Sequence, residues 1–123
     1  DASGADFEPV LRAVEALDPR ITVIRAEANQ GTYVRRNEAV QRARGRYVTM
    51  QDSDDWAHPR RLELQVRHLR STGAVANIVH ALRATDELGF TQPRGARLHL
   101  SEPSLMFVRE PVTARIGYFD AVR

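Results

Sequence analysis

Residues 47–55 read YVTMQDSDD, an apolar and β-branched run that is followed, after one glutamine, by three aspartates in four positions. The run over residues 47–50 predicts a β-strand. In open α/β sheets, ligands bind beyond the carboxyl ends of the strands. We therefore expect Asp52, Asp54 and Asp55 to lie at a functional edge of a sheet.

The sequence around this stretch alternates between helical and strand patterns. Apolar residues at helical spacing and helix-ending residues predict helices over residues 7–17, 32–44, 59–72 and 111–117. Strands are predicted at residues 21–24, 47–50, 74–82, 98–100 and 105–108, with a loop or hairpin over residues 86–97. Helices and strands that alternate at such short spacing are typical of a parallel α/β sheet.

Capping residues predict where the helices begin and end. Asp6 is expected to cap the first helix, and Pro59 is expected at the first position of the third helix. Gly45 and Gly73 are expected just beyond the second and third helices, because glycine adopts the left-handed conformation that ends many helices. The apolar residues expected to face inward from the third helix are Leu62, Val66 and Leu69.

The composition is that of one globular domain. The 123 residues include no cysteine, which excludes a disulfide scaffold, a Cys-ligated zinc site and a cysteine nucleophile. Arginine supplies all 18 basic side chains, and the formal net charge is only +2. The arginines are scattered among acidic residues, whereas a nucleic-acid footprint gathers them on one face, so we do not expect nucleic acid as a partner. No apolar run approaches the roughly 20 residues of a membrane span, and we expect a cytoplasmic protein.

The three aspartates of residues 52–55 repel one another. For two carboxylates about 5.5 Å apart, the repulsion costs roughly 3 kcal/mol at an effective dielectric constant near 20. A hard divalent cation with oxygen ligands would offset this repulsion, and a solvated acidic loop is the alternative. A calcium EF-hand is excluded, because Trp56 and Ala57 occupy the positions of a ligand and of the required glycine, and Pro59 falls inside the loop.

Several short motifs occur in a fixed order around the aspartates. They are NQG at residues 29–31, RN at 36–37, ARGRYV at 43–48, DSDDW at 52–56 with Pro59, and IGYFD at 116–120. This series, which contains a D-x-D motif, resembles family-2 glycosyltransferases of the GT-A fold. The resemblance implies a single α/β domain over residues 1–123, with a Rossmann-like sheet of mainly parallel strands flanked by helices and incomplete at both ends. It also implies that the chain is an internal portion of a longer transferase.

The same resemblance implies roles for individual residues. Asp54 matches the usual ligand of Mn²⁺ or Mg²⁺, and Asp52 matches the acid that approaches the ribose, or the metal through water. Asp55 would support the motif or contact the sugar. Arg36 matches an arginine beside the nucleotide, and its alternative is an ordinary surface arginine on an amphipathic helix. Asp1 matches an acid that contacts the base of the nucleotide.

The resemblance further implies a metal-dependent, inverting transfer of a sugar from a nucleoside-diphosphate sugar to an acceptor hydroxyl. The family's catalytic base commonly follows the segment that residues 116–120 resemble, so we expect the base outside this chain and expect the chain alone to be inactive. The alternative is a non-catalytic binding or assembly module that retains the fold. A magnesium-dependent phosphotransferase is disfavoured, because the chain lacks a glycine-rich phosphate cradle with a lysine. The expected location is cytoplasmic, with peripheral association with the inner membrane left open and no membrane span in this chain.

Overall fold

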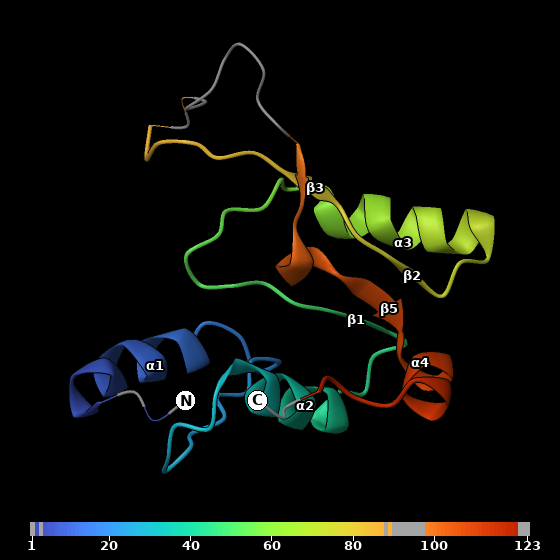
Figure 1. The fold of residues 1–123 in the computed structure, drawn as a ribbon. Coiled ribbons are helices and arrows are strands. Elements are labelled where there is room, and N and C mark those ends of the chain that lie inside the picture. The colour runs from blue at the N-terminus through green and yellow to red at the C-terminus, as the bar shows by residue number, and fades with distance from the viewer. Residues whose placement is uncertain (1, 3, 88, 90–97, 121–123) are drawn as a thin grey trace. The chain divides into compact units, whose positions relative to one another are not determined.

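The computed structural model of the chain describes residues 2, 4–87, 89 and 98–120 (Figure 1). The chain divides into two compact units. The first unit comprises Asp1–Ala43 and Tyr118–Arg123, and the second comprises Arg44–Gly117. None of the helices in the described part of the chain has the length and apolar character that a bilayer crossing requires.

Helices and strands both contribute to the structure, so the chain is α/β as predicted. In its described part, the first unit contains the helical segments η1 (Ala5–Phe7), α1 (Glu8–Glu15) and α2 (Thr32–Arg42). The second unit contains, where the structure describes it, β1 (Tyr47–Thr49), α3 (Arg61–Thr72), β2 (Ala76–Asn77), β3 (His80–Ala81), β4 (His99–Leu100), η2 (Glu102–Ser104), β5 (Met106–Val108) and α4 (Arg109–Arg115).

Helix α1 is shorter than the apolar pattern predicted. Pro9 lies in its first turn, where a missing backbone N–H costs no hydrogen bond. Asp6 is not the N-cap, because it lies inside η1 and Phe7 occupies the cap position. Leu17 lies beyond the end of the helix and is 77% exposed, and Val10 within the helix is 59% exposed. The apolar stripe therefore exists but remains largely exposed.

Two further predictions for the first unit are wrong. Residues 21–24 are not a strand, because a strand requires ladder hydrogen bonds to a neighbour and none of the described strands pairs with them. Helix α2 begins after Gly31, as predicted, but it ends at Arg42. Ala43 then takes an extended conformation as the C-cap, so the helix ends without a left-handed residue and Gly45 is not its end signal.

The sheet of the second unit has the strand order β1-β5-β2, and both outer strands run antiparallel to β5 (Figure 1). Phe107 of the central strand is level with Val48 on one side and with Ala76 on the other. Strands β1 and β2 consequently run in the same direction and are connected through α3, but they are not neighbours. The prediction of mainly parallel pairing is not confirmed, because β5 lies between the two parallel strands.

The predicted strand over residues 74–82 is divided between two sheets. Its first part is β2, and its second part is β3, which pairs antiparallel with β4. Between them, the N–H of Val79 donates to Oγ of Ser104 at 3.0 Å, and the carbonyl of Val79 accepts from the N–H of Ser101 at 2.9 Å. These bonds replace ladder bonds to β5 and end the first sheet at Asn77.

Helices α3 and α4 begin two residues away from the predicted positions. Helix α3 begins at Arg61, and Pro59 lies in the turn before it. Gly73 ends α3 with a φ of 70°, as predicted. Helix α4 begins before Pro111, which lies in its first turn, and it ends before Gly117 as predicted.

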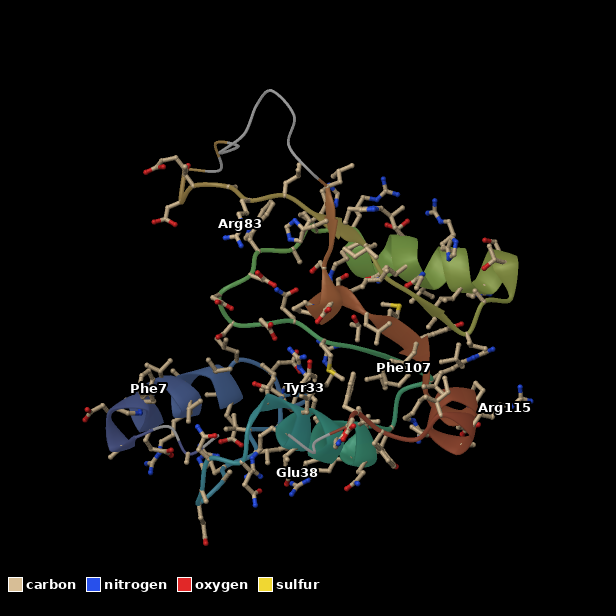
Figure 2. The ribbon with its side chains drawn as sticks, in the orientation of Figure 1. Phe7, Tyr33, Glu38, Arg83, Phe107 and Arg115 are labelled. Carbon is tan, nitrogen blue, oxygen red and sulfur yellow. The ribbon has the colours of Figure 1, made fainter. Side chains whose placement is uncertain are left out.

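The prediction for the inward face of α3 is confirmed at Leu69, which is buried, and wrong at Leu62, which is exposed. Figure 1 shows α3 lying along β2. Gln65 and Leu69 are each 3% exposed, whereas Leu62 is 52% exposed. The buried stripe therefore follows positions 61, 65 and 69, which are one turn apart. Leu69 is one of the buried apolar side chains of the second unit, together with Met106 and Phe107 of β5. Figure 2 labels Phe107.

Candidate functional site

The acidic turn, defined as residues 52–55, follows β1 after Met50 and Gln51. The N–H of Asp55 donates to the carbonyl of Asp52 at 3.2 Å, which closes the turn. Asp52 is half-buried, and the side chains of Asp54 and Asp55 are exposed. Within the part of the chain that the structure describes, neither of these two exposed carboxylates accepts a hydrogen bond or forms an ion pair. Asp54 and Asp55 therefore present their carboxylates to solvent from a turn of defined backbone shape.

The side chain of Gln51 bonds to the backbone of this turn. Its Nε2 donates to the carbonyl of Asp52 at 3.2 Å and to the carbonyl of Asp55 at 2.9 Å. Gln51 thus bonds to both ends of the acidic turn. Gln51 was not predicted as a site residue, because an exposed glutamine has no sequence pattern that separates it from other polar surface residues.

Arg61, at the start of α3, bonds to the end of β1 and to Gln51. Its Nη2 donates to the carbonyl of Met50 and to Oε1 of Gln51, both at 3.2 Å. Its Nη1 donates to Oγ1 of Thr49 at 3.3 Å and to Oε1 of Gln65 at 3.4 Å. Arg61 was missed as well, although its spacing of four residues from Gln65 and eight from Leu69 places the three on one helical face.

Gln65 connects this cluster to the interior of the second unit. Its Nε2 donates to the carbonyl of Ser104 at 2.8 Å and to Oδ1 of Asn77 at 3.0 Å. Nδ2 of Asn77 in turn donates to the backbone carbonyl of Gln65 at 2.9 Å. Because Gln65 and Ser104 are both buried, these hydrogen bonds satisfy polar atoms that water cannot reach.

Arg36 lies on α2 in the first unit. Its guanidinium carbon is 5.7 Å from the ring centroid of Tyr33, which is a cation–π distance. The ring of Tyr33 (Figure 2) stacks on that of Phe119, with centroids 5.9 Å apart. Asn37 donates from Nδ2 to the carbonyl of Phe119 and accepts at Oδ1 from its N–H, both at 2.8 Å. The motifs at residues 36–37 and 116–120 are therefore joined, although these partners are 82 positions apart.

The structure brings together some of the predicted site residues. Asp52, Asp54 and Asp55 share one turn, which belongs to the second unit, and Arg36 belongs to the first. Asp1 lies outside the described residues. No group of three or more His, Asp or Glu side chains among the described residues is arranged to hold a metal ion. The carboxylates of the turn nevertheless suit Mg²⁺ or Mn²⁺, because Mg²⁺ is commonly bound by one or two carboxylates together with water and substrate phosphates.

Comparison with known proteins places the chain in a family. The sequence profile described as "Glycosyl transferase family 2" matches residues 1–120. The chain is 34% identical over 82 residues to the uncharacterized glycosyltransferase MJ1057 of Methanocaldococcus jannaschii, an alignment that covers 67% of this chain and 28% of that protein. It is 41% identical over 69 residues to TuaG of Bacillus subtilis, named as a teichuronic acid biosynthesis glycosyltransferase, with 56% of this chain and 27% of TuaG covered.

A third relative is the succinoglycan biosynthesis protein ExoO of Rhizobium meliloti, which is 36% identical over 74 residues, or 60% of this chain and 21% of ExoO. The matched segments thus span little more than a quarter, or less, of the length of these relatives. The family profile covers nearly the whole of this chain, and it does so across the motifs that the sequence analysis singled out. The chain belongs to glycosyltransferase family 2.

Proposed function

We propose that the complete protein transfers a sugar from a nucleoside-diphosphate sugar to an acceptor hydroxyl, and that the acidic turn binds the diphosphate together with Mn²⁺ or Mg²⁺. The supporting observation is the pair of solvent-facing carboxylates, those of Asp54 and Asp55, in a hydrogen-bonded turn that follows β1. Membership of the family supports glycosyl transfer as the reaction class.

Each residue of the turn has a separate role in this proposal. The carboxylates of Asp54 and Asp52 would hold the divalent cation, and Asp55 would contact the sugar or support the turn. When bound, the cation supplies positive charge that stabilises the departing diphosphate. The hydrogen bonds of the turn keep its backbone in one shape, so the carboxylates need little reorganisation to bind.

Arg36 would bind the nucleotide and Asp1 would contact its base. The guanidinium of Arg36 is positioned over the Tyr33 ring, which restricts its side-chain freedom in the unbound protein. A restricted arginine loses less conformational entropy when it binds a ligand. The transfer would invert the anomeric centre, with a base that lies outside these 123 residues.

The acceptor in this proposal is a saccharide. Two relatives support this choice, because TuaG is named for teichuronic acid biosynthesis and ExoO for succinoglycan biosynthesis. Cytoplasmic location, expected from the sequence, stays a prediction.

Calorimetric titration of the complete protein with UDP, GDP and dTDP, each with Mn²⁺ or with EDTA, tests the proposal. We expect Mn²⁺ to raise the affinity for at least one nucleotide, and Asp54→Ala to remove most of that gain. Arg36→Ala should weaken nucleotide binding and leave the thermal midpoint of the ligand-free protein nearly unchanged.

Asp86→Ala is the matched control, since it removes an exposed aspartate of the second unit that lies outside the acidic turn. It should leave the gain from Mn²⁺ intact. If Mn²⁺ raised the nucleotide affinity of Asp54→Ala as much as that of the unmodified protein, the proposal that the acidic turn binds the metal would be refuted. The absence of nucleotide binding in the unmodified protein would instead favour a non-catalytic module.

A further inference from the structure

We propose that Arg61, acting through Gln51, is the positioning residue that holds the acidic turn in the shape that binds the cation and the diphosphate. This inference rests on the function proposed above. Arg61 itself contacts neither ligand in this proposal. It acts by fixing the backbone from which the carboxylates of the turn extend.

The first supporting observation is the pair of acceptors that Nη2 of Arg61 bonds. One is the carbonyl of Met50 and the other is Oε1 of Gln51, so a single nitrogen holds two consecutive residues that lead into the turn. Hydrogen bonds from a charged donor are stronger than those between neutral groups. The guanidinium of Arg61 therefore restrains both the backbone of Met50 and the side chain of Gln51, just before the turn.

The second observation is the orientation of the Gln51 amide. Its oxygen accepts from Arg61, and its nitrogen donates to the carbonyls of Asp52 and Asp55. A flipped amide would direct its N–H groups at the guanidinium and its oxygen at two carbonyl oxygens, and every contact would become repulsive. Arg61 thus selects the one amide orientation that donates to both ends of the turn.

The third observation is the rigid support of the guanidinium. Its Nη1 bonds to Thr49 and to Gln65, and Gln65 is 3% exposed and bonded to Ser104. Nε of Arg61 is buried with no hydrogen-bond partner among the described residues. An unsatisfied buried donor is a cost to stability. The planar guanidinium offsets this cost with four acceptors, on residues 49–51 and on Gln65, which a lysine ammonium cannot reach together.

The test compares the gain in UDP affinity that Mn²⁺ provides, measured by calorimetry on the complete protein, among matched variants. In Arg61→Met we expect this gain to fall about tenfold, because removing a group that holds metal ligands in place commonly lowers metal affinity by that much. Arg61→Lys should retain more of the gain than Arg61→Met, because the ammonium keeps the charge. It should retain less than the unmodified protein, because the ammonium reaches fewer acceptors. The affinity measured in EDTA should stay unchanged, whereas a general structural defect would lower both affinities.

Gln51→Met keeps the length of the side chain and removes its hydrogen bonds. Gln51 is exposed, so this variant tests the proposal even where Arg61→Met fails to fold. In Gln51→Met we expect the gain in UDP affinity from Mn²⁺ to fall about threefold. The double variant should lose no more of this gain than Arg61→Met alone, because both changes interrupt one chain of contacts. Arg60→Met is the control, since the neighbouring guanidinium bonds to Glu63 at 3.0 and 3.1 Å and makes no contact with the acidic turn among the described residues.

The outcomes separate this inference from the proposed function. A defective Asp54→Ala with normal Arg61→Met and Gln51→Met variants would overturn the role of Arg61 and leave the proposed function standing. A normal Asp54→Ala would refute the metal site, and the positioning role with it, whatever Arg61→Met does. Equal losses in Arg60→Met and Arg61→Met would also overturn the inference, because the effect would then come from any arginine at the start of α3.

Discussion

Replacing Gln65 by methionine should destabilise the second unit more than any exposed substitution of the same kind. The glutamine is 3% exposed, and its Nε2 donates to the carbonyl of Ser104 and to Oδ1 of Asn77. Methionine has nearly the same length and no donor. The substitution therefore removes these hydrogen bonds without opening a large cavity.

The magnitude follows from the burial of the two acceptors. Ser104 is 5% exposed, so its carbonyl cannot replace the lost bond with one to water and keeps only the long 3.5 Å bond from Oγ1 of Thr49. A buried acceptor that loses its short hydrogen bond costs about 1–3 kcal/mol. Asn77 is half-buried and recovers part of its loss from solvent. The apolar methionine side chain returns about 1 kcal/mol through its own burial. We expect a net loss of about 2 kcal/mol in the free energy of unfolding.

Equilibrium urea unfolding of the complete protein, followed by far-UV circular dichroism, measures this loss. With a slope of about 1–3 kcal/mol per molar urea, the midpoint should fall by about 1 M. Gln41→Met, an exposed change on α2, is the matched control and should cost less than about 0.5 kcal/mol. A Gln65→Met midpoint within about 0.2 M of the unmodified protein, at an unchanged slope, would refute the contribution of this buried cluster.

Substitutions at three further positions test contacts elsewhere. Asn37→Ala removes both bonds to the backbone of Phe119 and should cost about 1–3 kcal/mol in urea unfolding. Asn37→Asp should cost at least as much, because it keeps the acceptor but sets a carboxylate oxygen against the Phe119 carbonyl, and a clearly smaller loss in Asn37→Asp would contradict this. Gly73→Ala should cost about 1 kcal/mol in urea unfolding, from the φ of 70° alone, because no described atom lies within 4 Å of the added Cβ, and a stability equal to the unmodified protein would contradict this. The pKa of Glu8 lies below its ordinary value of 4.5, chiefly because Arg25 donates to its carboxylate. The ion pair therefore stabilises the first unit at neutral pH and loses its effect as the pH falls through the lowered pKa, and in Arg25→Met an NMR titration should show the Glu8 pKa closer to 4.5.

Local signals in the sequence predicted the parts of the fold that local chemistry determines. The short apolar runs at residues 47–50 and 105–108 became β1 and β5, and Gly73 ended α3 because a left-handed C-cap requires a glycine there. The acidic turn was likewise visible, because three aspartates beside a strand form a pattern in one stretch of sequence.

The remaining features depend on contacts between distant residues. The insertion of β5 between β1 and β2 cannot be inferred from either outer strand, and the hydrogen bonds of Val79 to residues 101 and 104 divided what the sequence showed as one strand. The inward face of α3 was predicted only in part, at Leu69, because apolar periodicity takes no account of a buried polar residue such as Gln65. On the inward face, Gln65 and the two Nη atoms of Arg61 find hydrogen-bond partners, which only the folded arrangement reveals.

The central position of β5 also has a consequence for protein synthesis. Strands β1 and β2 are translated first, but among the described strands each pairs only with β5, which follows β2 by about 30 residues. At about 5–20 residues per second, the ribosome therefore completes the central strand about 2–6 s after β2. Until then both outer strands expose unpaired backbone groups of the kind that recruit other chains. Slower translation of residues 78–105 would lengthen this interval and favour aggregation of the nascent chain over folding.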